Sequence, residues 1–337
     1  MNRSSLARLF SAGAVALAAL TSLPAHAGPF GALFVFGDSL SDNGNNAAVI
    51  GANGSQPIPN NGYVPSQPYA SGTYSNGPVW ANYYANMLGV SLTPSLLGGG
   101  DYAFGGATTG PVGAGGFPFS LVEQAGSYLT KTGGTAQADA LYVVAGGGNN
   151  ARAALGAIGG GANLGATVAA TAAAFANDIG TIVDALQAAG AQHIVVWNTP
   201  NLGLAPAVVA GGGAQLGSFL AGAMNGALAA RLNGEAGVST FDLFGLGGQL
   251  AANPAAFGFT NVTDACGAVA NANCSQYAYF DGIHPTTAAH MAIANAMFAA
   301  TVPVPEPETY ALMAFGLIAV AWAARRRPKV LAVAVSA

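Results

Sequence analysis

The stretch that decides the fold reads Leu33-Phe34-Val35-Phe36-Gly37-Asp38-Ser39. Its first four residues are apolar without alternation, as in a strand that is buried on both faces of a parallel sheet. The residues that follow predict a turn, so the Ser39 hydroxyl would emerge at the carboxyl edge of the sheet, where ligands bind in open α/β folds. Ser39 is therefore a candidate nucleophile. Asp38 and Ser39 are equally typical of a plain turn or a helix cap.

Apolar runs and helical patterns alternate along the rest of the chain. Strands are expected at residues 32–36, 102–104, 141–145, 193–197 and 239–241. Helices are expected at 79–88, 119–129, 164–189, 213–233 and 286–300, and a long surface loop near the site is expected over 51–76. This alternation predicts an α/β fold, with a five-stranded parallel sheet between two layers of helices.

Charged residues are scarce, at 7% of the chain against roughly 25% in typical soluble domains. Between residues 28 and 302, only Lys131, Arg152 and Arg231 stand against eleven acids. So few cations cannot neutralise a run of phosphates, which excludes nucleic-acid binding. The hydrophobic share of 52% excludes a disordered polyanion.

Both ends of the chain have the pattern of targeting segments. Residues 1–27 combine Arg3, Arg8, a short apolar run and a small-residue site at Ala27, which predicts a cleaved signal peptide. An N-terminal membrane anchor is the weaker alternative, because the run is short for a bilayer. Near the other end, Pro305-Glu306-Pro307 precedes a largely apolar stretch over 309–324 and a cluster of three arginines. Sixteen helical residues reach about 24 Å, just short of the ~30 Å hydrocarbon core.

This C-terminal pattern resembles the PEP-CTERM sorting signal of Gram-negative bacteria. The resemblance implies transient insertion of residues 309–324 into the inner membrane, processing by an exosortase and delivery to the cell surface or extracellular medium. A plain C-terminal anchor is the alternative, and the tail over 328–337 is longer than such signals usually carry. The expected organisation is a signal peptide over 1–27, one domain over 28–302 and a sorting segment over 303–337.

A serine nucleophile needs a general base, and the chain has four histidines. His26 would leave with the signal peptide, whereas His193 and His290 fall within a predicted strand and a predicted helix, which indicates structural roles. His284 lies three residues after Asp281, across a glycine. If that turn folds back, Asp281 accepts from Nδ1 of His284 and leaves Nε2 facing the serine. A histidine satisfied within its own turn is the alternative.

Two glycine-rich loops are candidates for an oxyanion hole. Gly105-Gly106 follows the second predicted strand, and Gly146-Gly147-Gly148-Asn149-Asn150 follows the third. Backbone N–H groups and an asparagine amide can bind a tetrahedral oxyanion, at ~3 kcal/mol per donor. Taken alone, each loop is more often an ordinary strand-to-helix turn. The G-x-S-x-G elbow of ordinary α/β hydrolases does not occur in the sequence.

Taken in order, these blocks resemble the SGNH/GDSL hydrolase family over roughly residues 31–300, and most of all its secreted lecithinase/haemolysin-like esterases. The resemblance implies a flavodoxin-like sheet in the order 2-1-3-4-5. The implied site consists of Ser39 as nucleophile and first oxyanion donor, Gly106 as second donor with Gly105 as the alternative, Asn149 as side-chain donor, and His284 with Asp281. One departure is Asn150, where the family usually has an aspartate.

Two functions from different classes follow. The first is an exported serine esterase or lipase that acts through an acyl-enzyme intermediate on lipid, glycan or polyester esters, with a phospholipase or an O-acetyl-polysaccharide esterase as variants of the same class. It would need no cofactor and no metal, since no residues show metal-ligand spacing. The second is a surface or matrix protein that binds acyl or glycan ligands with a weakened site, for which Asn150 is the only sequence support.

The chain has two cysteines, Cys266 and Cys274, in a stretch rich in asparagine and alanine. In an exported protein, two close cysteines predict a local disulfide. Two free buried thiols are the alternative.

Overall fold

The structure is a computed structural model that describes residues 29–110, 116–302 and 307–325. The chain divides into two compact units, one ending at Phe298 and one beginning at Ala299. The predicted signal peptide lies outside the described residues, as do Pro305, Glu306 and the tail after Arg325.

Four parallel strands form the central sheet, in the order β1-β2-β3-β4. Their bounds are Ala32–Gly37 for β1, Ala140–Ala145 for β2, His193–Trp197 for β3 and Val238–Phe241 for β4. The register places Phe34 beside Tyr142, and Tyr142 beside Ile194. Four of the five predicted strands are therefore confirmed, each to within one residue.

The fifth predicted strand, over residues 102–104, is wrong as a strand. Next to it, Asp101 makes isolated parallel bridges to Val35 and Pro94 but belongs to no strand. The segment still runs along β1, because Tyr102 N donates to Val35 O at 2.8 Å. A regular parallel ladder would also pair Gly37 N with Tyr102 O, but Gly37 N donates to Gln124 Oε1 at 2.8 Å instead. The segment occupies the place beside β1 that the order 2-1-3-4-5 assigns to the second strand.

Helices surround this sheet. The bounds are α2 (Asn45–Ile50), α3 (Trp80–Leu88), α4 (Leu121–Lys131), α5 (Gly148–Gly159), α6 (Leu164–Ala188), α7 (Pro206–Ala210), α8 (Ala214–Arg231), α9 (Leu243–Ala252) and α10 (Thr287–Thr301). The helices predicted from the sequence correspond to α3, α4, α6, α8 and α10. Four helices were not predicted: α2 and α7, which are short, and α5 and α9, which contain several glycines, among the weakest helix formers. A small two-stranded sheet of β5 (Asn261–Ala265) and β6 (Tyr277–Tyr279) was not predicted either.

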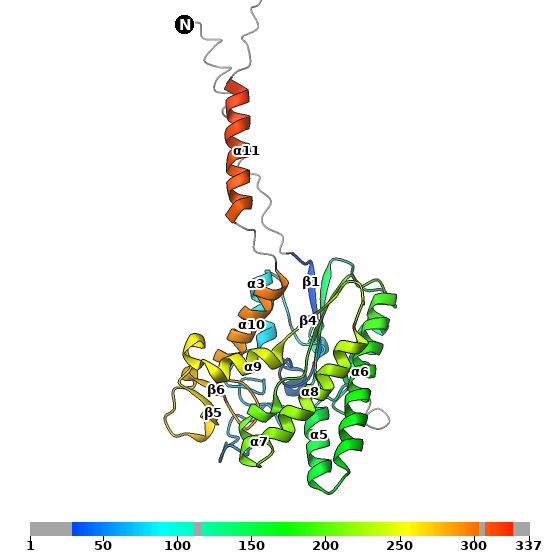
Figure 1. Ribbon diagram of the computed structural model, residues 1–337, viewed down its shortest axis with the longest axis vertical. Coiled ribbons are helices and arrows are strands. Elements are labelled where there is room, and N and C mark those ends of the chain that lie inside the picture. The colour runs from blue at the N-terminus through cyan, green and yellow to red at the C-terminus, as the bar shows by residue number, and fades with distance from the viewer. Residues whose placement is uncertain (1–28, 111–115, 303–306, 326–337) are drawn as a thin grey trace, which may run out of the picture. The chain divides into compact units, whose positions relative to one another are not determined.

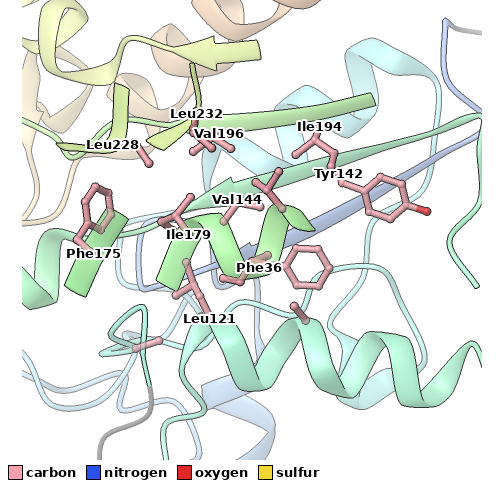
Figure 2. Close-up of a cluster of buried hydrophobic side chains, with 14 of the residues drawn as sticks. Phe36, Leu121, Tyr142, Val144, Phe175, Ile179, Ile194, Val196, Leu228 and Leu232 are labelled. Carbon is pink, nitrogen blue, oxygen red and sulfur yellow. The ribbon is translucent and has the colours of Figure 1, made fainter. Parts of the chain in front are cut away.

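The side chains of each central strand alternate between two cores, as the period of a strand requires. On one face, Tyr142 and Val196 belong to a cluster shared with α4, α5, α6 and α8 (Figure 2). On the other face, the Trp197 ring lies 4.3 Å from that of Trp80 on α3, and its Nε1–H donates to Met297 Sδ on α10. Figure 1 shows α5, α6 and α8 on one side of the sheet and α3 and α10 on the other. The α/β/α arrangement is confirmed.

One described helix, α6, is long and apolar enough to cross a membrane by length and composition alone. Its residues Phe175, Ile179 and Val183 are fully buried in the core, so this apolar face serves packing within the domain. In the second unit, α11 (Pro307–Arg325) is apolar over Leu312–Trp322.

Candidate active site

Ser39 lies in the turn directly after β1, with 8% of its surface exposed. Asp38 closes this turn: its backbone oxygen accepts from the N–H groups of Ser41 and Asp42, and its Oδ1 accepts from Leu40 N at 3.0 Å. Burial raises the pKa of Asp38 to about 6. Asp38 is thus the capping residue of the turn, which leaves the Ser39 hydroxyl for a different partner.

That partner is His284, and the two side chains form a line with Asp281. The distance from Ser39 Oγ to His284 Nε2 is 2.8 Å, and from His284 Nδ1 to Asp281 Oδ2 it is 2.7 Å. Because a carboxylate only accepts, Nδ1 carries the proton and Nε2 is free to accept from the Ser39 hydroxyl. Residues 245 positions apart in sequence are therefore arranged for proton transfer from the serine.

Asp281 is fully buried and accepts hydrogen bonds at both carboxylate oxygens. Its Oδ1 accepts from the backbone N–H groups of Ile283 and His284, both at 2.8 Å. Its Oδ2 accepts from His284 Nδ1 and from the Tyr69 hydroxyl at 3.0 Å. Burial, with the Asp281 carboxylate as a second cause, raises the pKa of Tyr69. Four donors hold Asp281 in one orientation and compensate its burial.

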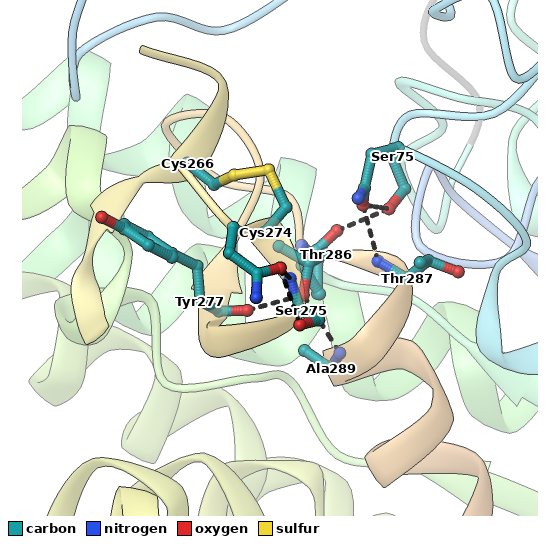
Figure 3. Close-up of a disulfide and its surroundings, with 11 residues drawn as sticks. Ser75, Cys266, Cys274, Ser275, Tyr277, Thr286, Thr287 and Ala289 are labelled. Carbon is teal, nitrogen blue, oxygen red and sulfur yellow. Dashed lines mark hydrogen bonds between the residues drawn. A yellow bond between two sulfur atoms is a disulfide. The ribbon is translucent and has the colours of Figure 1, made fainter. Parts of the chain in front are cut away.

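The segment that carries His284 is held from two sides. Thr286 Oγ1 donates to Tyr277 O at 2.7 Å, which ties the segment to β6. Ser75 Oγ donates to Pro285 O at 2.8 Å from the loop before α3. Figure 3 shows Thr286 and Thr287 close to Ser75 and Tyr277. These two hydrogen bonds restrict movement of the segment that carries His284.

A disulfide between Cys266 and Cys274 lies in the same region (Figure 3). The two Cα atoms are 5.5 Å apart. Cys266 directly follows β5, and Gly267 N donates to Phe280 O at 2.9 Å. The bridge thus closes the connection between β5 and β6, from which the chain runs on to His284.

The structure distinguishes between the two candidate glycines of the oxyanion hole. Gly105 N donates to Asp42 Oδ2 at 2.9 Å, so its N–H is occupied. Gly106 has a φ of 85°, which favours glycine, and it lines a cavity together with Ser39 and His284. Among the described residues, the N–H of Gly106 has no acceptor. Gly106 is therefore the available donor.

Asn149 lies in the first turn of α5, where both ends of its amide are held. Its Nδ2 donates to Ala107 O at 2.8 Å, and its Oδ1 accepts from Arg152 Nη1 at 3.2 Å. An amide nitrogen carries two hydrogens, so one has no acceptor within the described structure. Asn149 lines both cavities that contain Ser39.

Asn150, the departure from the family pattern, anchors the loop that contains Gly106. Its Oδ1 accepts from Thr109 N at 3.1 Å, and its Nδ2 donates to Thr109 Oγ1 at 2.9 Å. The Thr109 hydroxyl in turn donates to Asp178 Oδ2 at 2.7 Å. An amide can make both bonds to Thr109, whereas an aspartate could only accept.

Two cavities meet at Ser39. One of about 130 Å³ is largely apolar, and its lining includes Leu202, Leu243, Leu246, Leu250 and Ile293. The other, of about 260 Å³, has a more polar lining that includes Asn46, Ser66, Tyr74, Gly106 and Phe117. Both are lined by Ser39, Asn149, Arg152, Ile283 and His284. An ester bound at Ser39 can therefore extend in two directions into chemically different surroundings.

Several residues at the site did not emerge from the sequence as site residues. Tyr69 comes from the loop over 51–76, which has no periodic pattern. Tyr74, from the same loop, has its ring 5.2 Å from that of His284. Gln124 on α4 exchanges two hydrogen bonds with the backbone of Gly37, just before the turn. Only the expected position of the loop near the site could have pointed to the two tyrosines.

No group of three or more His, Cys, Asp or Glu side chains is placed to hold a metal ion within the described ranges. His193, at the start of β3, contacts Phe30 with ring centroids 5.4 Å apart. His290, on α10, is fully buried, and neither ring nitrogen has a hydrogen-bond partner in the described structure. The structure brings neither histidine into contact with Ser39.

The chain is similar in sequence to known lipases and esterases. Lipase 1 of Photorhabdus luminescens is 31% identical over 203 residues, which cover 60% of this chain and 27% of the relative. Esterase EstA of Pseudomonas aeruginosa is 30% identical and covers 83% of this chain and 48% of its own. This chain thus spans half or less of the length of these relatives. Among solved structures, Est24, a carbohydrate acetylesterase from Sinorhizobium meliloti, matches with a TM-score of 0.43 and 16% identity, over 80% of this chain and 98% of its own.

Two family models match the chain in separate regions. The PEP-CTERM protein-sorting motif matches residues 303–327, which supports export to the cell envelope of a Gram-negative bacterium. The GDSL-like lipase/acylhydrolase model matches residues 33–297, which include every residue of the site described above. On that match, the chain belongs to the GDSL-like lipase/acylhydrolase family.

Proposed function

We propose that this chain is an exported serine ester hydrolase, with Ser39, His284 and Asp281 as its catalytic triad. The observation that carries the proposal is the unbroken hydrogen-bonded line from Ser39 Oγ through His284 to the buried Asp281 carboxylate. Family membership supports the same reaction class. In this proposal, the enzyme domain spans residues 28–302, and the segments on either side of it are removed by processing.

The geometry supports a two-step reaction. His284 Nε2 takes the hydroxyl proton as Ser39 Oγ attacks the ester carbonyl carbon, and Asp281 stabilises the imidazolium that forms. The oxyanion accepts from the N–H groups of Ser39 and Gly106 and from Asn149 Nδ2, each donor contributing ~3 kcal/mol. His284 then protonates the departing alcohol. Water hydrolyses the acyl-Ser39 intermediate by the same steps, which restores the free serine.

The two cavities supply places for the two halves of an ester. The apolar cavity of about 130 Å³ suits an acyl chain, because its walls are mostly leucine and isoleucine. The more polar cavity of about 260 Å³ then takes the alcohol portion. An acyl-chain-length series that includes phospholipids and O-acetylated glycans would rank the candidate substrates.

No observation favours the alternative of a protein that only binds its ligand. Its sequence support was Asn150, and that side chain makes two hydrogen bonds to Thr109. The substitution therefore leaves an anchored loop beside Gly106.

Ser39→Ala tests the proposal. We expect loss of p-nitrophenyl butyrate hydrolysis and of labelling by a fluorophosphonate, since no other described serine is hydrogen-bonded to a histidine. Ser55→Ala is the matched control, because Ser55 is exposed and bonds only to Asn53. A fluorophosphonate label that persists on another serine of Ser39→Ala would disprove the assignment.

The same proposal includes removal of both targeting segments. The signal peptide over 1–27 is cleaved, and residues 309–324 insert transiently into the inner membrane until an exosortase-type enzyme removes the segment over 303–337. The sorting-motif match and the apolar stretch of α11 support this route to the cell surface or extracellular medium. Mass spectrometry of protein from the surface of the native host should find neither end. Met1 or Arg327 in that material would refute the processing.

A further inference from the structure

Arg152 is the only cation that lines either cavity at Ser39 within the described residues. The domain has two others, and both are engaged elsewhere. Lys131 lies over the Tyr102 ring, 5.9 Å from its centroid. Arg231 pairs with Asp184 at 2.6 Å and with Glu235 at 2.7 Å. In a domain so short of cations, the position of Arg152 at the meeting point of the cavities calls for an explanation.

The guanidinium of Arg152 uses little of its bonding capacity. It has five N–H donors, and in the described structure only Nη1 has an acceptor, Asn149 Oδ1 at 3.2 Å. No carboxylate there lies within ion-pair distance of it. Burial lowers the pKa of Arg152, and the opposing attraction of Asp281 and Asp38 acts from farther away. A partly buried cation with unused donors is costly unless an anion joins it.

The nearby acids are poorly placed to be that anion. Both oxygens of Asp281 are taken by its four donors. Asp38 is buried and held in the turn by its bond from Leu40 N, and it makes no ion pair with Arg152 in the described structure. The unused donors of Arg152 are therefore left for a group that enters the cavities at Ser39, both of which Arg152 lines.

We propose that Arg152 is an anion-binding subsite, and that the natural substrate carries a phosphate diester or a carboxylate on its alcohol portion, close to the scissile ester. This inference rests on the proposed ester hydrolysis at Ser39. The alcohol side is favoured because the cavity assigned to it has the more polar lining, whereas leucines dominate the acyl cavity. Phosphate and carboxylate share the paired oxygens that match a guanidinium fork.

Two esters of the same shape isolate the effect of the negative charge. They are 4-carboxyphenyl butyrate, which is anionic, and 4-carbamoylphenyl butyrate, which is neutral. The measured quantity is the ratio of their kcat/KM values in the wild type and in Arg152→Gln. We expect that ratio to fall about tenfold in the variant, as for a hydrogen bond to a charged group. Arg152→Lys keeps the charge without the fork, so it should retain part of the preference.

The design separates this role from the bond between Arg152 and Asn149. Loss of that bond slows both esters alike and cancels in the ratio. Lys131→Gln is the matched control for net charge, because Lys131 lines neither cavity at Ser39, and its ratio should equal that of the wild type. A ratio unchanged in Arg152→Gln while both esters are cleaved overturns the anion subsite alone. A wild type that cleaves neither ester overturns the proposed function and the subsite together.

Two further pairs identify the source of the anion. Dibutyryl phosphatidylglycerol is compared with tributyrin, and O-acetylated glucuronic acid with O-acetylated glucose. If the ratio of kcat/KM values depends on Arg152 only in the first pair, the anion is a phosphate diester. If it depends on Arg152 only in the second pair, the anion is a carboxylate. If neither ratio depends on Arg152, the proposal that the natural substrate carries this anion is wrong.

Discussion

Replacing Asp281 with asparagine tests how His284 is held, because the structure dictates which way the new amide turns. Asp281 Oδ1 accepts from the backbone N–H groups of Ile283 and His284, both at 2.8 Å. Only the amide oxygen can replace it there. The NH₂ group must then take the Oδ2 position, which in the wild type is 2.7 Å from His284 Nδ1.

This orientation inverts the tautomer of His284. The amide donates to Nδ1, so the ring proton moves to Nε2, the nitrogen 2.8 Å from Ser39 Oγ. Nε2 can then no longer accept the hydroxyl proton. In serine proteases with this triad, the wrong tautomer lowers kcat about 10⁴-fold, which corresponds to about 5.4 kcal/mol. We expect a loss of that order for Asp281→Asn.

The assay is kcat for p-nitrophenyl butyrate, together with thermal unfolding to show that the variant folds. Both backbone hydrogen bonds to the side chain are kept, so the fold should persist. Tyr69→Phe removes a single donor from Oδ2 and should cost only a few-fold in kcat, since the His284 bond remains. Asp184→Asn, a surface change, should leave kcat unaltered. A folded Asp281→Asn variant with kcat within tenfold of the wild type would refute the tautomer argument.

Burial lowers the pKa of His290 to about 3, with His284 as a smaller cause, so the protein loses stability as pH falls from about 6.5 towards 3. His290→Leu removes this loss. Between pH 7 and pH 4.5, the free energy of unfolding measured in urea should therefore fall by roughly 2–3 kcal/mol less in the variant than in the wild type. The same pH dependence in both proteins would contradict the argument. In Gly105→Ala, the new Cβ overlaps the Tyr74 ring, so the loop with Gly106 shifts and kcat should fall at least about tenfold; wild-type kcat would show that this loop does not hold the donor. EDTA should leave esterase activity unchanged, and a loss that Zn²⁺ or Mg²⁺ restores would disprove metal-independent catalysis.

The features that could be predicted from the sequence are those with a local or ordered pattern. The unbroken apolar runs at 33–36 and 194–197 predict strands buried on both faces, because a run of that length has few other stable environments. The candidates Ser39, Asp281 and His284 followed from their places after a strand or within one turn. Their order along the chain, together with Asn149, pointed to the family. Such features can be recognised without the fold, because they depend on neighbouring residues or on the order of residues along the chain.

Other features depend on which distant segments meet, and these leave no periodic trace in the sequence. The choice of Gly106 over Gly105 depends on Asp42, which takes up the Gly105 N–H from a loop 63 residues away. Tyr69 reaches Asp281 across 212 residues from a loop without regular structure. Residues 102–104 do not form a regular strand, because Gln124 takes the Gly37 N–H that would otherwise pair with Tyr102 O. In each case a long-range hydrogen bond decides the outcome, and its partners become neighbours only when the chain has folded.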